Sequence, residues 1–204
     1  MALNRFRSLS NRAISPFVAA ADRLGLTPNA VTAASMVVAV LAAVILWTAR
    51  NDPSWYLLGG AFVLLNGFLD VLDGALARQT NSETAAGDYL DHVIDRYADV
   101  VILIGLIASV DQYAIGIIAI AGVLLNAYLG TQAQAVGLGR MYGGLITRIE
   151  VLLLIGGVSI AATWVTATYG GLTIVGWLLV FFAIASNGTA LQRARRSWML
   201  LQDD

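Results

Sequence analysis

Four aspartates interrupt a stretch of this chain that is otherwise apolar enough to cross a membrane. Asp70 and Asp73 are three residues apart and Asp91 and Asp95 are four apart, in the runs DVLDGALAR and GDYLDHVID, which eight residues separate. On helices, these spacings place each pair on one face. Because ionised carboxylates are costly at membrane depth, two such pairs facing each other predict a functional site.

The chemistry that suits such a carboxylate cage is metal-assisted phosphoryl transfer. Hard divalent cations take oxygen ligands, and Mg²⁺ or Mn²⁺ commonly serves phosphate substrates. Two ions about 4 Å apart can stabilise both the attacking and the leaving oxygen. Gly74 and Gly87 leave room for a phosphate or a neighbouring helix, and Arg78 offers a planar donor. Two alternatives stay open: polar contacts that hold a helix bundle together, and the cation site of a channel or transporter.

Composition indicates a membrane protein independently of this motif. Hydrophobic residues make up 58% of the chain, charged residues make up 12%, and the mean hydropathy is +0.75. A soluble domain carries about 25% charged residues. The chain has no cysteine, which excludes disulfides and thiolate chemistry, and no lysine, which excludes Schiff-base chemistry. A net charge of −1 gives no indication of a nucleic-acid partner.

We predict an all-α integral-membrane bundle of six helices, each near the roughly 20 residues that a bilayer needs. The expected spans are Val31–Ala49, Trp55–Ala77, Leu90–Val110, Tyr113–Ala133, Val151–Tyr169 and Leu172–Leu191. A tight turn at Gly170 and Gly171 is expected to join the last two.

The chain divides into an N-terminal segment, residues 1–26, and a membrane domain, residues 27–204. Arginines alternate with apolar residues along the first segment, a pattern typical of an amphipathic juxtamembrane helix on the membrane surface. Thr27 is the expected cap of the first span, with Pro28 at the first helical position.

The arginines predict the orientation in the cell membrane. In a six-span chain, both termini and the second and fourth loops share one side. All arginines but Arg50 flank or lie on that side, which is therefore cytoplasmic by the positive-inside rule. The aspartates then lie at the cytoplasmic ends of spans two and three.

The aspartate motif resembles, at every defined position, the signature of the CDP-alcohol phosphotransferases. The positions that carry the resemblance are Asp70, Asp73, Gly74, Ala77, Arg78, Gly87, Asp91 and Asp95. The six-span layout and the segment Thr27-Pro28-Asn29-x-x-Thr32 extend it over most of the chain. Members of this family transfer a phosphatidyl-type group, on diacyl or archaeal diether lipid, from a CDP-linked lipid to an alcohol and release CMP.

The resemblance also implies roles for individual residues. Asp70, Asp73, Asp91 and Asp95 would hold two divalent metal ions, Mg²⁺ or Mn²⁺, and Asp95 would also be the catalytic general base. The CDP-lipid pocket would be lined by Gly74, Ala77, Arg78 and Gly87, with Asn29 and Thr32 as additions. Asp99, one turn beyond Asp95, is expected to hydrogen-bond around the site or to pair with Arg96. The family further implies a homodimer.

The acceptor is expected to be a phosphorylated polyol such as glycerol phosphate or inositol phosphate. Arg148 enters span five and Arg193 leaves span six on the side of the aspartates. Arginines without acidic partners suit an acceptor phosphate, and the alternative is that both only anchor the chain at the membrane surface. Family members that use inositol phosphate often carry a lysine near the end of span four. Residues 128–134 contain none, which weakens the inositol phosphate alternative.

Two other functions compete with this interpretation. Membrane prenyltransferases also use two aspartate motifs with Mg²⁺ against a pyrophosphate, but they usually have more spans than 204 residues allow. A divalent-cation transporter is the non-enzymatic alternative, and it would not need the spacing of Gly74, Ala77 and Arg78.

Overall fold

The computed structural model describes residues 14–139 and 146–202 and is helical over both ranges. Residues 14–23 form a short helix that precedes the long ones. The long helices are α2 (Pro28–Thr48), α3 (Trp55–Gln79), α4 (Ala85–Val110), α5 (Tyr113–Ala135), α6 (Arg148–Ala162) and α7 (Ile174–Gln202). The predicted all-α class is therefore confirmed for the described residues.

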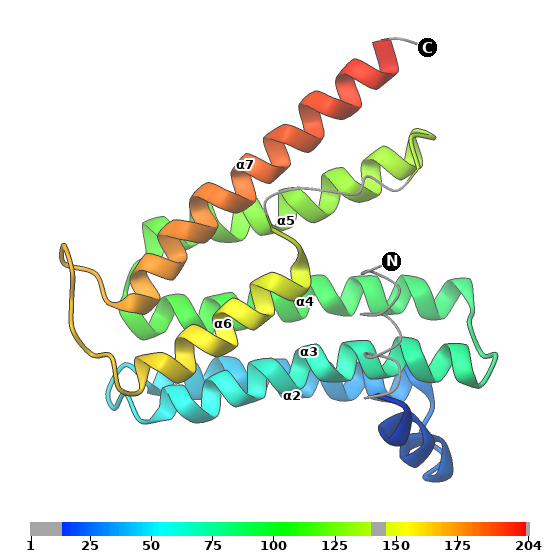
Figure 1. The fold of residues 1–204 in the computed structure, drawn as a ribbon, viewed down its shortest axis with the longest axis horizontal. Coiled ribbons are helices and arrows are strands. Elements are labelled where there is room, and N and C mark those ends of the chain that lie inside the picture. The colour runs from blue at the N-terminus through cyan, green and yellow to red at the C-terminus, as the bar shows by residue number, and fades with distance from the viewer. Residues whose placement is uncertain (1–13, 140–145, 203–204) are drawn as a thin grey trace, which may run out of the picture.

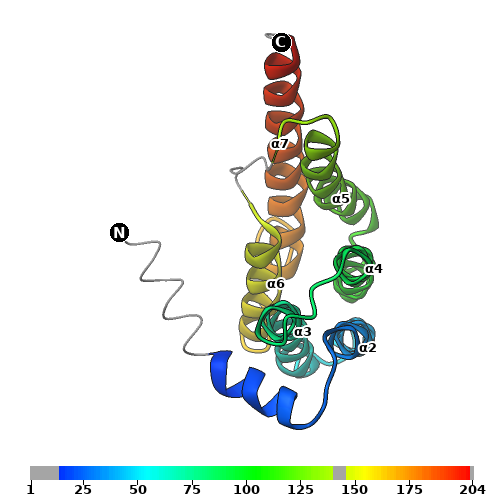
Figure 2. The same cartoon turned by 90° about the vertical axis from the view of Figure 1, so that its right-hand side faces the viewer.

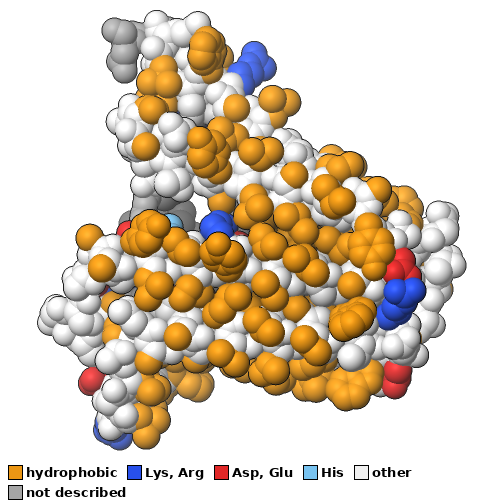
Figure 3. All heavy atoms as spheres, turned by 180° about the vertical axis from the view of Figure 1, so that it is seen from behind, with side chains coloured by type: hydrophobic (Ala, Val, Ile, Leu, Met, Phe, Trp, Pro, Cys, Tyr) orange, Lys and Arg blue, Asp and Glu red, His pale blue; other side chains and the backbone are white. Residues whose placement is uncertain are grey.

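Four of the helices, α2, α3, α5 and α7, are long and apolar enough to cross a membrane. The surface of the bundle in Figure 3 is accordingly apolar along the helices, with its charged side chains mostly at the ends. Each predicted span overlaps a helix of the described residues, but α4 and α6 are not among the four candidates, so six spans are not confirmed. Helix α6 has only 15 residues, fewer than the roughly 20 that a bilayer needs.

The boundaries of the last two predicted spans need correction. Helix α6 ends at Ala162, well before the predicted Tyr169, and α7 continues to Gln202, well beyond the predicted Leu191. The tight turn is confirmed, because Tyr169 and Leu172 exchange backbone hydrogen bonds of 2.9 and 3.2 Å across Gly170 and Gly171. Both glycines have positive φ, +59° and +81°, which side chains with a Cβ rarely adopt.

Helix caps fix where the helices begin. Thr27 accepts a hydrogen bond of 3.3 Å from the backbone N–H of Ala30, and Pro28 opens α2 as predicted. At α6, the backbone N–H of Thr147 donates to the Glu150 carboxylate at 2.6 Å. Such caps satisfy N–H groups that have no partner inside the helix. The second of these sets the position of Arg148.

The helices form two groups. Helix α2 packs on α3 and α4, α3 packs on α6, and α5 packs on α7. Figures 1 and 2 show the α5–α7 pair diverging from α2, α3 and α4, so that its far end stands apart from them. Residues 14–23 lie across the ends of α2 and α3, with Val18 and Ala21 buried in a cluster that includes Leu72 and Leu76. The first half of the predicted amphipathic helix, residues 1–13, lies outside the described residues.

The closest approach of α2 and α4 yields a test of this packing. A Cβ at Gly105 would overlap the backbone of Ala43, whereas a Cβ at Gly157 on α6 would meet no described atom within 4 Å. We expect Gly105→Ala to destabilise the protein by about 1–3 kcal/mol, since an extra methyl group in a packed core forces the backbone to move. Thermal unfolding in detergent should show a lower Tm.

Gly157→Ala is the matched control. The same substitution at an open helical position should leave the Tm unchanged or raise it, because alanine favours the helix by about 0.5–1 kcal/mol. Equal effects of both substitutions would contradict the close helix contact.

Candidate active site

Three of the predicted aspartates form one cluster. Asp70 on α3 and Asp91 and Asp95 on α4 each offer a carboxylate oxygen, and these oxygens lie within 4.8 Å of one another. Oδ1 of Asp91 is buried and accepts no hydrogen bond from the described residues. A buried oxygen of this kind is costly unless something binds it. An all-oxygen donor set with such an atom fits Mg²⁺ or Mn²⁺.

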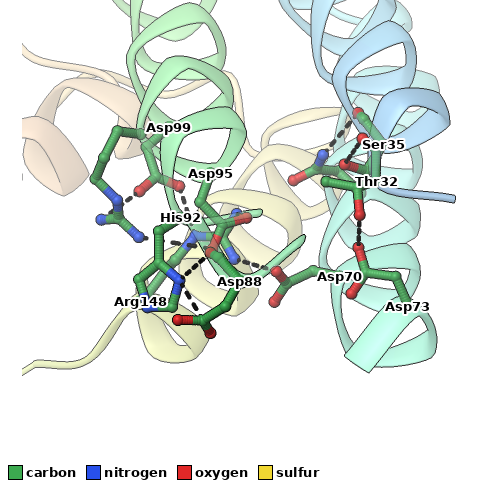
Figure 4. A network of polar contacts seen from close by, with 11 residues as sticks. Thr32, Ser35, Asp70, Asp73, Asp88, His92, Asp95, Asp99 and Arg148 are labelled. Atoms are coloured by element: carbon green, nitrogen blue, oxygen red, sulfur yellow. Dashed lines mark hydrogen bonds and ion pairs between the residues drawn. The ribbon is translucent and has the colours of Figure 1, made fainter. Parts of the chain in front are cut away.

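Asp73, the fourth predicted ligand, is not in this cluster. Its side chain is 3% exposed, and Oδ2 accepts a hydrogen bond of 2.7 Å from Oγ1 of Thr32 on α2. Figure 4 shows Asp73 beside Thr32, on the far side of Asp70 from Asp95. Its role as a metal ligand therefore remains a prediction.

Arg148 closes the other side of the cluster. Its guanidinium contacts Asp70 at 2.8 Å through Nη1, Asp95 at 2.8 Å through Nη2, and Asp99 at 3.0 Å through Nε. The expectation that Arg148 has no acidic partner is therefore wrong. Because α6 packs on α3, its first residue is placed over carboxylates that lie 49 or more positions away in sequence. No local sequence pattern reports such a pairing.

Asp99 is shared between two arginines. Oδ1 accepts from Nε of Arg148 at 3.0 Å, and Oδ2 lies 2.9 Å from Nη1 of Arg96. The expected pairing of Asp99 with Arg96 is thus confirmed, and Figure 4 shows Asp99 facing Arg148 as well. A guanidinium on each oxygen offsets the cost of burying this charge.

A small cavity of about 210 Å³ lies between the starts of α2 and α4 and the end of α3. Asp73 and Asp91 line it. Every residue predicted for the CDP-lipid pocket also lines it: Asn29, Thr32, Gly74, Ala77, Arg78 and Gly87. A Cβ at Gly87 would lie 3.1 Å from Oγ1 of Thr84 and 3.4 Å from Oδ1 of Asn29, so a side chain there would crowd the cavity.

A second, larger cavity of about 1060 Å³ lies among α4, α5, α7 and the start of α6. Arg148 and Arg193, the two predicted acceptor-binding residues, both line it. Nη1 of Arg193 donates to the backbone oxygen of Asn126 at 2.8 Å. A Cβ at Gly130 would lie 2.8 Å from Nη1 of Arg193. Residues of the segment 128–134, which contains no lysine, line this cavity too.

The sequence analysis assigned no place in these cavities to three residues that line them, although it named Arg96 as a partner of Asp99. Thr84 caps α4 by accepting from the backbone N–H of Gly87 at 3.0 Å and lines the small cavity. Asn126 and Arg96 line the large one. A threonine three residues before Gly87 is a helix-start signal that could have been used for Thr84. Asn126 and Arg96 carry no comparable signal.

Comparison with known proteins places these features in a family. The model of the CDP-alcohol phosphatidyltransferase domain matches residues 25–194. The chain is 30% identical to archaetidylinositol phosphate synthase of Methanothermobacter thermautotrophicus over 205 residues, covering 98% of this chain and 96% of that protein. It is 35% identical to phosphatidylinositol phosphate synthase of Mycolicibacterium smegmatis over 192 residues, covering 87% of this chain and 80% of the relative.

Two solved structures of one relative match the fold of this chain. The crystal structure of Mycobacterium tuberculosis phosphatidylinositol phosphate synthase with CDP-DAG bound matches with a TM-score of 0.77 and 26% identity, covering 92% of this chain and 94% of that one. The same enzyme in complex with manganese and citrate matches with a TM-score of 0.77 and 26% identity, covering 91% and 88%. The chain belongs to the CDP-alcohol phosphatidyltransferase family, which its aspartate motif resembles.

Proposed function

We propose that this enzyme transfers a phosphatidyl-type group from a CDP-linked lipid to inositol phosphate and releases CMP. The observation that carries the proposal is the position of the aspartate cluster between two cavities. Asp91 lines the small cavity, and Arg148, which contacts Asp70 and Asp95, lines the large one. A reaction between two bound substrates requires such an arrangement, because holding both partners in place removes much of the entropic barrier.

The small cavity suits the CDP group. Arg78 supplies a donor for phosphate oxygens, and Gly74 and Gly87 keep side chains away from the space next to Asp73 and Asp91. Neither a prenyltransferase nor a cation transporter requires this combination. The family assignment therefore leaves both alternatives without support.

The large cavity suits a phosphorylated acceptor. Arg96, Arg148 and Arg193 line it, and guanidinium groups bind phosphate through paired N–H donors. The relatives reported above are named archaetidylinositol phosphate synthase and phosphatidylinositol phosphate synthase. Their names favour inositol phosphate over glycerol phosphate, in spite of the missing lysine in residues 128–134.

Asp70, Asp91 and Asp95 would hold divalent metal, with Asp73 completing a site for two ions. When bound, the ions would neutralise the pyrophosphate and stabilise the charge that develops on the departing CMP. Manganese in the solved relative supports a divalent ion of this kind. The ligands that the protein would offer to these ions are carboxylate oxygens.

Asp95 is the proposed general base. Oδ1 of Asp95 is held by Arg148 at 2.8 Å, while Oδ2 contacts Arg96 only at 3.8 Å. The acceptor hydroxyl would give its proton to this carboxylate while its oxygen attacks the phosphorus that bears the lipid. The bond from that phosphorus to the CMP oxygen breaks in the same displacement.

The membrane arrangement is part of the proposal. Six helices would cross or enter the bilayer, with both termini and the active site on the cytoplasmic face, as the arginine distribution indicates. Residues 1–26 would lie along that face as an amphipathic helix, and Phe17 and Leu24 are exposed there. Family resemblance supports a homodimer.

The acceptor is tested by CMP release from a CDP-linked lipid in the presence of inositol phosphate, glycerol phosphate or free inositol. We expect release only with inositol phosphate and divalent metal, and none in excess EDTA, because the carboxylates alone repel the pyrophosphate. CMP release with glycerol phosphate alone would make glycerol phosphate the acceptor in place of inositol phosphate. Full activity in EDTA would overturn the metal assignment.

Arg193 and Arg195 form a matched pair on α7. Arg193 lines the large cavity, whereas Arg195 is exposed and does not. We expect Arg193→Gln to raise the KM for inositol phosphate about tenfold or more, the size of a lost charge-assisted hydrogen bond, with little change in the KM for CDP-lipid. Arg195→Gln should change neither constant. Equal effects of Arg193→Gln on both substrates would assign this arginine to membrane anchoring.

The roles of Asp91 and Asp95 can be distinguished by testing whether excess metal restores the activity of each variant. Asp91→Asn should weaken metal binding and lose most turnover, part of which returns at high Mn²⁺. Asp95→Asn should lower kcat by about 10²–10⁴ at saturating metal, since the proton acceptor is gone. CDP-lipid affinity should persist in that variant. Recovery of Asp95→Asn at high Mn²⁺ would instead make Asp95 a ligand only.

A further inference from the structure

Asp99 is a buried carboxylate beside the active site that the proposed chemistry does not use. It is 2% exposed and lies one turn beyond Asp95 on α4. The metal-competent cluster consists of Asp70, Asp91 and Asp95 and does not include it. Its two oxygens contact two different arginines, Arg148 at 3.0 Å and Arg96 at 2.9 Å.

The two arginines that Asp99 contacts belong to the same cavity wall. Arg148 and Arg96 come from different helices, α6 and α4, and both line the large cavity. Asp99 gives each of them one oxygen, at 3.0 and 2.9 Å. Two guanidinium groups this close repel each other, and the carboxylate between them offsets that repulsion.

The contact with Nε also sets the orientation of Arg148. A guanidinium is planar, and its N–H groups point in fixed directions. With Nε directed at Asp99, the two terminal nitrogens face Asp70 and Asp95, at 2.8 Å each. Each terminal nitrogen carries two N–H groups, so the guanidinium has more donors than its contacts with Asp70 and Asp95 use, and Arg148 lines the large cavity.

We propose that Asp99 is a positioning residue for the acceptor phosphate. It holds Arg148 and Arg96 at the boundary between the aspartate cluster and the large cavity, where their charges bind the phosphate of a phosphorylated polyol. The inference rests on the proposed function for the identity of that acceptor. Without the charge of Asp99, the hydrogen bond from Nε of Arg148 is no longer charge-assisted, and Asp70 and Asp95 become the main groups that hold the guanidinium.

Kinetics of Asp99→Asn provide the first test. Asparagine keeps the shape of the side chain and removes its charge. We expect the KM for inositol phosphate to rise about tenfold or more, and the KM for CDP-lipid to change by less than about twofold. Asp111→Asn is the control, because Asp111 pairs with Arg50 at 2.6 Å in an exposed ion pair outside both cavities described above.

A double mutant separates positioning from general damage. If Asp99 acts through Arg148, Asp99→Asn should add little to the acceptor KM of Arg148→Lys, because interacting residues are not additive. Multiplied effects, or equal increases in both KM values, would overturn the proposal. Should Asp99→Asn fail to fold, Asp99→Glu keeps the charge one methylene out of place, and its acceptor KM is expected to lie between wild type and the loss expected for asparagine.

A second measurement does not depend on the acceptor. In protein labelled with ¹⁵N-arginine in detergent, the Nε–H resonance of Arg148 is identified by its loss in Arg148→Lys. We expect this hydrogen to exchange slowly with water in wild type and faster in Asp99→Asn, and to be unaffected by Asp111→Asn. An unchanged resonance in Asp99→Asn would overturn the positioning role. Absence of CMP release from wild type with inositol phosphate would instead overturn the proposed function and leave this measurement valid.

Discussion

Compensation of carboxylate charge in a largely apolar bundle is the constraint on which the rest of this structure depends. Asp70, Asp95 and Asp99 all contact the single guanidinium of Arg148, and Arg96 provides a second positive charge beside Asp99. Burying a carboxylate without a partner costs several kcal/mol or more, roughly what a small protein has in total stability. The arginines therefore keep the cluster folded, while Asp91 retains an oxygen without a hydrogen-bond partner among the described residues.

The helix arrangement follows from this requirement. Carboxylates come from α3 and α4, and the arginine that unites them must come from a third direction, which the start of α6 supplies by packing on α3. The Thr147 and Glu150 cap fixes that start. The α5–α7 pair diverges from the remaining helices (Figure 1). The large cavity is lined by residues of α4, α5, α7 and the start of α6, including Arg148. Reactive groups thus sit on rigid helices, with substrate space on both sides.

Local patterns predicted much of this and long-range pairing very little. The cap at Thr27 and the turn at Gly170 follow from motifs that act over a few residues. The gathering of the six cavity residues from three helices was implied by the family resemblance and by no local pattern. The partners of Arg148 did not follow, because an arginine at a helix start looks the same whether it faces lipid headgroups or aspartates 49 or more positions away. The end of α6 was also misplaced, since hydrophobicity continues past Ala162 into residues that form a loop.

The absence of a lysine from residues 128–134 on α5 is explained by the same compensation of charge. Attraction between a cation and a phosphate depends on distance and burial, not on which helix carries the cation. Arg96 on α4, Arg148 on α6 and Arg193 on α7 all line the large cavity, so positive charge reaches it from three helices without a contribution from residues 128–134. Two of these arginines are already held by Asp99, whose burial makes their positions hard to change. In the proposed reaction, these three arginines therefore supply the positive charge for the acceptor phosphate, and Gly130 on α5 leaves the space that Nη1 of Arg193 occupies.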